Sequence, residues 1–288
     1  MKIGKININS IAASGFTSVL NCYEKMPSQL YVAGKLPSTR IPAVAIVGSR
    51  KPTKYGEEVT YRLASELARA GVVIISGLAY GIDAIAHTAA LEAGGTTIAI
   101  LAGGLHRIYP PSHQGLAERI IQSGGAIISE QEEGIDAHKY HFLARNRLVS
   151  GLADAVIVTE ATDKSGTFST VAHAISQNKD VFAVPGPITS LLSAGPNRLI
   201  QEGAHVVLTT QDILDVIAPQ LKQKQTRLAL GSTPLETEII AHIQAGVNSG
   251  EALQTAIEAP VSDILQALTM LELNGIIRPI GANHWQIR

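Results

Sequence analysis

The sequence is poor in the features that assign a chain to several common classes. Its 288 residues include one cysteine, Cys22, which excludes a disulfide framework and leaves no second thiol for a zinc site. We expect Cys22 to be a buried structural thiol. No apolar run reaches the roughly 18 residues that a membrane helix requires, and the initial MKIGKININS has no apolar block typical of a secretion signal. These absences predict a globular, cytoplasmic protein that does not associate with membranes.

An excess of positive charge is also missing. The net charge is -1 and is unevenly distributed, because residues 1–42 have five basic residues and one acidic residue, whereas residues 234–288 have two and six. A protein that coats DNA through bulk positive charge is therefore excluded. Any site for a nucleic acid must be local.

Motifs of the common nucleotide-dependent enzymes are absent as well. The first predicted strand ends in Gly48-Ser49-Arg50, without the G-x-G-x-x-G fingerprint of dinucleotide enzymes. No G-x-x-x-x-G-K-[ST] phosphate-binding loop occurs either. We therefore expect no cofactor.

Short apolar runs alternate with helix-length segments from residue 43 onward. The runs occupy residues 43–47, 72–75, 96–101, 126–129, 155–159, 181–184 and 205–208. Strands rich in Val, Ile and Ala that are separated by crossover helices predict a parallel sheet with both faces covered. The fold class is therefore α/β, with a doubly wound, mostly parallel sheet of about seven strands.

The patterns divide the chain into four parts. Residues 1–42 form an N-terminal extension packed on the core, in which Tyr31 to Ala33 are a candidate edge strand. Residues 43–217 form the α/β domain, and residues 218–233 read as a polar linker. Three short helices and a terminal hairpin over residues 234–288 predict a small winged-helix domain.

The last of those three helices has an unusual charge for a DNA-reading element. Residues 261–274 include Asp263 and Glu272 and have no Lys or Arg. Binding in a DNA groove would forgo the phosphate attraction that supplies most affinity. We predict that this helix contacts protein or has a structural role.

Small residues dominate the segments that follow the predicted strands. These segments are VGSRKP, ISGLAYG, LAGGLHRIYPP, SEQEEG, TEATDKSGT and VPGPITS. The carboxyl ends of parallel strands meet at one edge of a sheet, where backbone N–H groups and hydroxyls bind phosphate. In SGLAYG, Gly77 and Gly81 would let the backbone approach an anion, and Ser76 would donate a hydrogen bond. The alternative is that these glycines serve tight turns only.

The acidic residues and histidines form no recognisable catalytic or metal centre. Asp83 and His87 lie one helical turn apart, which favours helix stabilisation and a local hydrogen bond. His138 and His141 have no third ligand nearby, so we expect no metal. Glu130 and Glu160 follow strands, yet no Ser or Cys nucleophile with a partnered base accompanies them. Nothing in the sequence demands an enzyme.

Basic residues follow the same strand ends and are interleaved with aromatic residues. Arg50 leaves the first strand, Lys164 opens KSGT, and KYHFLARNR combines Lys139, Phe142, Arg145 and Arg147. Such interleaving suits single-stranded nucleic acid, where cations follow phosphates and rings stack on bases. The alternative is that Phe142 belongs to the core and the arginines form surface ion pairs.

Ordered motifs across residues 43–204 resemble the DNA-processing protein A (DprA/Smf) family. They are VGSRKPTKYG, SGLAYGIDAIAH, TIAILAGGLHRIYPPSH, SEQEEG, FLARNRLVSGLAD, VTEATDKSGTFST and VPGPITSLLSAGPNRLIQEGA. The resemblance implies an extended Rossmann-like core and a non-enzymatic protein that binds single-stranded DNA, forms a homodimer and loads the RecA recombinase during natural transformation. The stretch before Met26 is too short for the helical domain that many members have there.

The resemblance also implies a set of DNA-binding residues. They are Gly48, Ser49, Arg50, Ser76, Gly77, Lys139, Phe142, Arg145, Asn146, Arg147, Lys164, Ser165, Gly166 and Thr167. In this interpretation Arg50, Arg145 and Arg147 clamp phosphates and Phe142 stacks on a base, while the small residues donate from backbone and hydroxyl groups.

Two other functions fit a related core. The sequence resembles nucleotide phosphoribohydrolases, which have a P-G-G-x-G-T-x-x-E segment with a reactive glutamate. Here Val171 falls near that position in KSGTFSTV, so the acid/base group is missing. A nucleotide-sensing regulator stays open, since Gly- and Ser-rich loops fit it equally.

Overall fold

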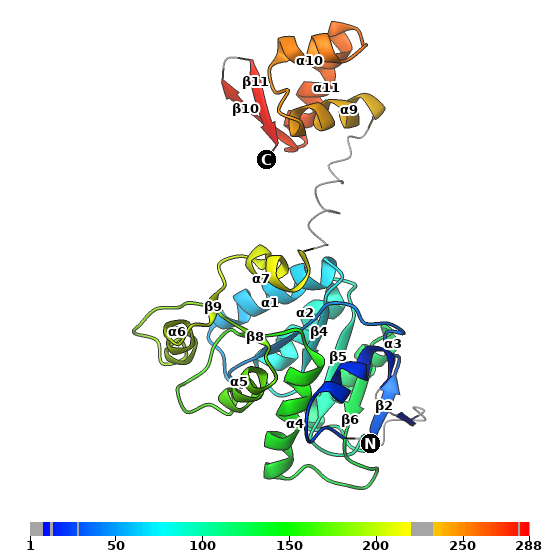
Figure 1. Ribbon diagram of the computed structural model, residues 1–288, viewed down its shortest axis with the longest axis vertical. Helices are drawn as coiled ribbons and strands as arrows, with labels where there is room; N and C mark the ends of the chain where they lie inside the picture. Colours follow the sequence, from blue (N-terminus) through cyan, green and yellow to red (C-terminus); the bar gives the residue numbers. More distant parts are fainter. Residues whose placement is uncertain (1–7, 12–13, 28, 220–232, 282, 288) are drawn as a thin grey trace. The chain divides into compact units, whose positions relative to one another are not determined.

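The computed structural model describes residues 8–11, 14–27, 29–219, 233–281 and 283–287 (Figure 1). The chain separates into two compact units, Met1–Ala218 and Pro219–Arg288. Each unit has its own buried hydrophobic core. Most of the predicted linker, residues 218–233, lies outside the described residues.

The first unit is built on a sheet of nine strands among the described residues. Their order is β1-β2-β6-β5-β4-β3-β7-β8-β9. The strands are β1 (Ile8–Ile11), β2 (Leu30–Gly34), β3 (Ala43–Val47), β4 (Val73–Ser76), β5 (Thr97–Leu101), β6 (Ala126–Ser129), β7 (Ala155–Val158), β8 (Asp180–Ala183) and β9 (His205–Val206). β3 to β9 pair in parallel, whereas β1 and β2 are antiparallel to their neighbours. The predicted doubly wound, mostly parallel α/β class is confirmed.

The N-terminal part of the sheet differs from the prediction. Tyr31 to Ala33 lie in β2, which is not an edge strand because β1 pairs with its outer side and β6 with its inner side. The predicted strand at residues 205–208 is shorter, since β9 ends at Val206. Pairing with other strands decides both features, and local composition does not specify that pairing.

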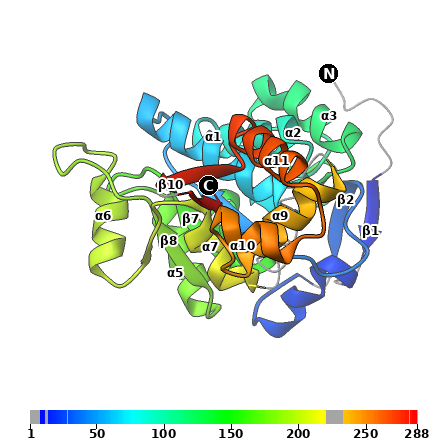
Figure 2. The same cartoon turned by 90° about the horizontal axis from the view of Figure 1, so that it is seen from above.

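Helices cover both faces of the sheet (Figure 2). One face carries α1 (Lys54–Arg69), α2 (Ile82–Glu92) and α3 (Gln114–Gln122), and the other carries η1 (Gly15–Cys22), α4 (Lys139–Leu152), α5 (Thr167–Ser176) and α6 (Ala194–Gln201). The short helix η2 (Pro111–His113) precedes α3, and α7 (Thr210–Ile217) contacts α1.

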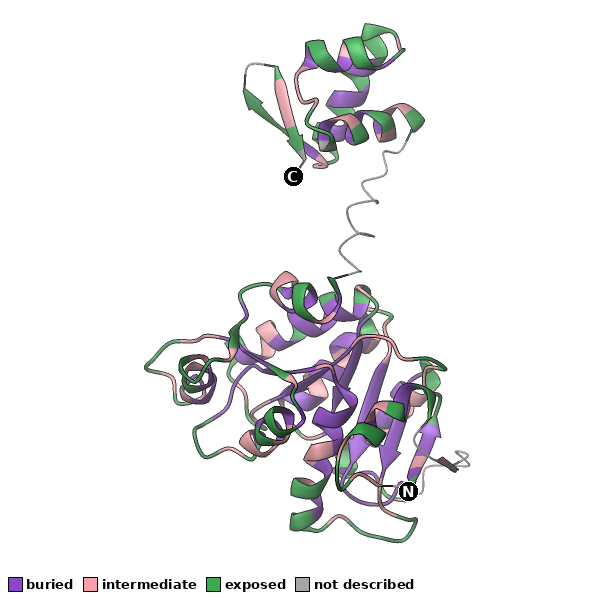
Figure 3. Cartoon of the chain, viewed as in Figure 1, coloured by how far each residue is buried: buried purple, intermediate pink, exposed green. Residues whose placement is uncertain are grey.

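The two-sided cover explains why the strands are apolar at every position. In β5, Ile98 and Ile100 pack with Leu148 of α4, whereas Ala99 and Leu101 pack with residues of α3. All five residues of β5 are buried, and the central strands are buried throughout in Figure 3. Alternate side chains point to opposite faces, so a strand with two dry faces needs apolar residues throughout.

The single cysteine does not contribute to this core. Cys22 is exposed at the end of η1, whose buried side is formed by Phe16, Thr17 and Leu20. The expectation of a buried thiol is therefore wrong. None of the described helices combines the length and hydrophobicity needed to span a bilayer.

The second unit contains three helices and a hairpin among its described residues. They are α9 (Pro234–Gln244), α10 (Gly250–Ala256), α11 (Val261–Leu273), β10 (Ile277–Gly281) and β11 (His284–Ile287). Ile239, Leu253, Ile264 and Leu271 belong to one core that all three helices share. The element order is that of the predicted winged helix, and the winged-helix assignment itself stays a prediction.

Candidate nucleic-acid interface

A cavity of about 660 Å³ opens at the carboxyl edge of the sheet. It lies where the strand order switches, because the chain proceeds from β3 through β6 on one side and resumes with β7 on the other side of β3. Ligands of doubly wound sheets bind at this crevice. Nine predicted residues line the cavity: Gly48, Arg50, Lys139, Phe142, Arg145, Asn146, Ser165, Gly166 and Thr167.

The loop after β3 is held by backbone contacts that leave Arg50 exposed. The Ser49 amide donates to the Glu160 carbonyl at 2.7 Å, and the Ser49 carbonyl accepts from the Ile82 amide at 3.1 Å. Gly81 has φ 71°, and a Cβ there would lie 2.3 Å from the Ser49 carbonyl oxygen. Gly81 therefore admits the close approach of this loop, and its predicted role toward an anion stays a prediction.

The N-terminus of α5 forms a second wall of the cavity. The Ser165 hydroxyl donates to Thr167 Oγ1 at 2.8 Å, and the Thr167 hydroxyl donates to the Gly48 carbonyl at 3.3 Å. No acidic residue occupies the first turn of α5. The positive end of the helix dipole therefore faces the cavity without a neutralising carboxylate of its own, which favours an anion.

Aromatic rings form the third wall. Phe142 is half-buried, and its ring meets the exposed Tyr109 ring edge to face at 5.5 Å between centroids. The Arg50 guanidinium carbon lies 5.8 Å from the centroid of Phe142. Tyr109 lines the cavity and was missed by sequence reasoning, although it is an aromatic residue in the segment that follows β5. A base entering here would meet two rings and a guanidinium.

Arg145 lies beneath these groups and is engaged by the protein. Its Nη1 donates to the Gly77 carbonyl at 2.7 Å and also to the Ile100 carbonyl. Burial lowers the pKa of Arg145 to about 10. A Cβ on Gly77 would lie 2.4 Å from that Nη1 atom, so Gly77 makes room for the guanidinium and not for an anion. The predicted phosphate clamp at Arg145 is thus replaced by a link between the loop after β4 and strand β5.

Ser76 and Asp83 also serve the loop after β4. Ser76 is fully buried, and its hydroxyl donates to the Ile46 carbonyl at 2.7 Å. The Asp83 carboxylate accepts from the amides of Gly77 at 3.1 Å and Ala79 at 3.3 Å. Burial raises the pKa of Asp83, and the nearby Arg145 opposes that rise. The predicted donation by Ser76 to a ligand is therefore wrong in this structure.

His87 pairs with strand β5 instead of with Asp83, contrary to the predicted local hydrogen bond. Its Nδ1 lies 2.6 Å from Thr97 Oγ1, whose hydroxyl donates to the Ile74 carbonyl at 2.7 Å. The hydroxyl has one proton, which it donates to Ile74, so Nδ1 must be the donor in the bond to Thr97. Nε2 is buried and has no hydrogen-bond partner among the described residues. Burial lowers the pKa of His87 to about 3.

Two predicted cations lie outside the cavity lining. Arg147 Nη2 donates to the Glu130 carboxylate at 2.6 Å, and its side chain is 18% exposed. Arg147 is thus paired with a carboxylate and is not part of the cavity lining, and its predicted role as a phosphate clamp stays a prediction. Lys164 is exposed in the loop just before Ser165. Ser49 is half-buried and lies in the same loop as Arg50.

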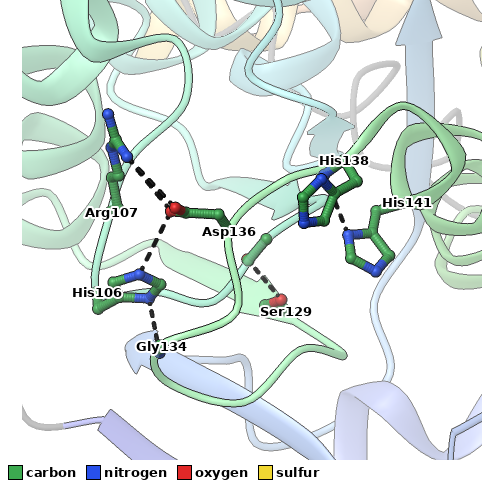
Figure 4. Close-up of polar contacts among 8 residues, drawn as sticks. His106, Arg107, Ser129, Gly134, Asp136, His138 and His141 are labelled. Carbon is green, nitrogen blue, oxygen red and sulfur yellow. Dashed lines mark hydrogen bonds and ion pairs between the residues drawn. The ribbon is translucent and has the colours of Figure 1, made fainter.

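The loop between β6 and α4 is fastened to the segment after β5 (Figure 4). Asp136 pairs with Arg107 at 3.4 Å and with His106 at 3.7 Å, and His106 Nδ1 accepts from the Gly134 amide at 3.0 Å. These contacts tie the loop to the segment after β5 and thereby position the start of α4. The exposed Lys139 is the first residue of that helix.

Glu160, His138 and His141, which the sequence analysis considered for catalysis or metal binding, have structural partners. Glu160 is buried and accepts from the Thr53 amide at 2.8 Å and the Thr53 hydroxyl at 2.6 Å, which fixes the start of α1. The His138 amide donates to His141 Nδ1 at 3.2 Å at the start of α4 (Figure 4). The described part of the chain contains no group of three metal-ligating side chains.

Comparisons with known proteins agree with this geometry. The family model of DNA recombination-mediator protein A matches residues 7–218. Protein Smf of Escherichia coli is 36% identical over 274 residues, covering 91% of this chain and 72% of the relative. The DNA processing protein DprA of Bacillus subtilis is 37% identical over 211 residues, covering 73% and 71%.

Solved structures extend the similarity to three dimensions. DNA processing protein A of Streptococcus pneumoniae superposes with a TM-score of 0.67 at 37% identity, covering 75% of each chain. The Helicobacter pylori protein, whose structure concerns its single-stranded DNA binding mode, gives 0.68 at 33% identity and covers 76% of this chain and 99% of that one. The resemblance read from the motifs is confirmed, and the chain belongs to the DNA recombination-mediator protein A family.

Proposed function

We propose that this chain binds single-stranded DNA in the cavity at the carboxyl edge of its sheet. The observation that carries the proposal is the convergence of Arg50, the Phe142 and Tyr109 rings and the α5 N-terminus on one depression. Cations and helix N-termini bind phosphates, and rings stack on bases that are not paired. Duplex DNA keeps its bases stacked inside, so it would leave the rings unused.

The roles of the predicted residues divide by position. Arg50 and Lys139 would bind phosphates, with hydrogen bonds from the small residues around them, namely Gly48, Ser49, Asn146, Ser165, Gly166 and Thr167. Phe142, supported by Tyr109, would stack on a base. Lys164 would extend the basic track beyond the cavity. Ser76, Gly77 and Arg145 would hold the floor in place without contacting DNA.

The cellular role follows the family. The Helicobacter pylori relative is described by its single-stranded DNA binding mode, and we propose the same ligand for this chain. We further propose that it forms a homodimer and transfers the bound strand to the RecA recombinase during natural transformation, in the cytoplasm. Residues 43–217 would form the DNA-binding domain and residues 234–288 a winged-helix domain.

A binding role is favoured over the phosphoribohydrolase alternative by the acidic groups near the cavity. Thr170 stands where the G-T-x-x-E spacing would place that enzyme's glutamate, and both Thr170 and the neighbouring Val171 are buried residues of α5 without an acidic group. Glu160 accepts from Thr53, and Asp83 accepts from two backbone amides. These hydrogen bonds engage both carboxylates within the protein and favour a binding protein over a hydrolase.

The proposal is tested by titrating the full chain with fluorescein-labelled oligo-dT and with a duplex of equal length. We expect tight binding of oligo-dT that weakens with salt, and much weaker binding of the duplex. Equal affinity for the two, or no binding of either, would overturn it. Incubation with nucleoside monophosphates tests the phosphoribohydrolase alternative, because steady release of free base would establish the hydrolase instead.

A further inference from the structure

Helix α11 is apolar on two sides, and only one of them is covered. Its inner side packs in the core of the second unit through Ile264, Ala267, Leu268 and Leu271. Its outer side exposes four large apolar residues: Val261 at 51%, Leu265 at 46%, Met270 at 42% and Leu273 at 75%. A helix on the surface of a globular unit ordinarily places polar residues there.

The exposed apolar residues form a stripe along one side of the helix that is interrupted by the exposed Ser262, Gln266 and Thr269. Val261, Leu265 and Leu273 recur at intervals of four or eight residues, with Thr269 between the last two, so they lie along one side of the helix. Met270 widens the stripe in its C-terminal half. Large exposed apolar side chains gathered on one side of a surface helix mark a site for another molecule.

Carboxylates border the stripe and define what can cover it. At 100° per residue, Glu272 lies at one margin of the outer side and Asp263 at the other, while Glu258 is exposed just before the helix. α11 contains no Lys or Arg, and the Arg278 guanidinium of β10 donates to Gln286 at 3.2 Å. The surface is therefore apolar with an acidic margin.

We propose that this side of α11 docks a basic amphipathic helix of a partner protein. Apolar residues of the partner at i, i+3, i+4 and i+7 would cover the stripe, and its Lys and Arg would face Asp263 and Glu272. DNA is disfavoured because phosphates would meet these carboxylates. A second copy of α11 is disfavoured because a twofold contact would bring the same carboxylates together. The inference is independent of the proposed DNA site.

The test uses the full chain and a labelled peptide of about 18 residues, long enough to form a helix, built from Leu at the amphipathic spacing and Lys elsewhere. We expect saturable binding that L265S and L273S each weaken about tenfold, and that D263N and E272Q weaken less and mainly at low salt. The matched control is L191S, which removes a leucine that is 82% exposed in the first unit and should leave binding unchanged. A peptide with Glu in place of Lys should not bind.

Several results would overturn the proposal. They are failure of the Lys peptide to bind, equal loss in L191S and L273S, and equal binding of the Glu peptide. Sedimentation showing that L273S dissociates an oligomer would assign the surface to a second copy. Hydrogen exchange showing α11 protected by the first unit in the free chain would assign it to an internal contact. Circular dichroism of each variant confirms that the fold is retained.

Discussion

The cavity has a buried floor and an open rim, and the polar side chains of the two regions differ in what they contact. Asp83 and Arg145 line the cavity, and the floor comprises these two residues with the buried Ser76, Gly77 and His87, which lie outside the lining. The rim comprises Arg50, Tyr109, Lys139 and Phe142. Floor groups donate to or accept from the protein's own backbone and side chains, whereas Arg50 and Lys139 are exposed. The same edge of the sheet thus contains two kinds of residue: those that shape the site and those that are free to bind a ligand.

The comparison predicts that floor substitutions affect stability and rim substitutions affect affinity. Arg145→Met should have the largest effect on stability, because it leaves the Gly77 and Ile100 carbonyls unpaired and removes the positive charge near Asp83. We expect the free energy of unfolding to fall by about 2–5 kcal/mol in urea titrations.

The matched control for Arg145→Met is Arg50→Met. Arg50 is exposed, so the same change there should alter the free energy of unfolding by no more than about 0.5 kcal/mol. Similar stability losses in the two variants would erase the distinction between floor and rim.

Phe142→Ala should have the next largest effect, and on affinity. Loss of one stacking ring costs about 1–3 kcal/mol, which is roughly 5- to 150-fold in the dissociation constant for oligo-dT. Fluorescence anisotropy measures the loss, and Phe142→Tyr serves as control because it keeps a ring. If Phe142→Ala binds as the wild type does, stacking at the rim is wrong.

His87 predicts an effect on stability that depends on pH. Its pKa is about 3 in the folded chain and about 6.5 in the unfolded chain, so the unfolded state takes up a proton first as the pH falls. Stability should therefore decline between pH 6.5 and pH 3 by about 1 kcal/mol per unit, and the decline should be absent above that window.

His87→Asn isolates this contribution, because an amide can still donate to Thr97. The difference in unfolding free energy between wild type and variant should change across the window, while the opposite influence of Asp83 cancels in that difference. A constant difference would show that His87 is not buried as a neutral base.

The sequence predicted the parts of the fold that local composition controls. The strands at Ala43–Val47 and Ala126–Ser129 match β3 and β6, because strands buried on two faces consist of small and branched apolar residues. The order β1-β2-β6 could not be read, since it depends on pairing between segments almost a hundred residues apart. The exposed Cys22 was missed for a similar reason, because the packing of η1 decides which side is buried.

Motifs indicated the candidate site but did not separate its two regions. Gly77 and Arg145 stand in segments rich in glycine and basic residues, and nothing local shows that they contact one another. Arg147 lies two positions from Arg145, yet on a helix these side chains point in different directions, and Arg147 pairs with Glu130. Tyr109 could have been found as the aromatic residue that follows β5.

The central claim is that the exposed rim binds the phosphates of single-stranded DNA. The most direct test measures oligo-dT affinity against salt for wild type, Arg50→Ala and Arg69→Ala, the last an exposed arginine at the end of α1. The account predicts that Arg50→Ala weakens binding and lowers the slope of log affinity against log salt by about 1, while Arg69→Ala changes neither. Wild-type affinity and slope in Arg50→Ala would contradict it.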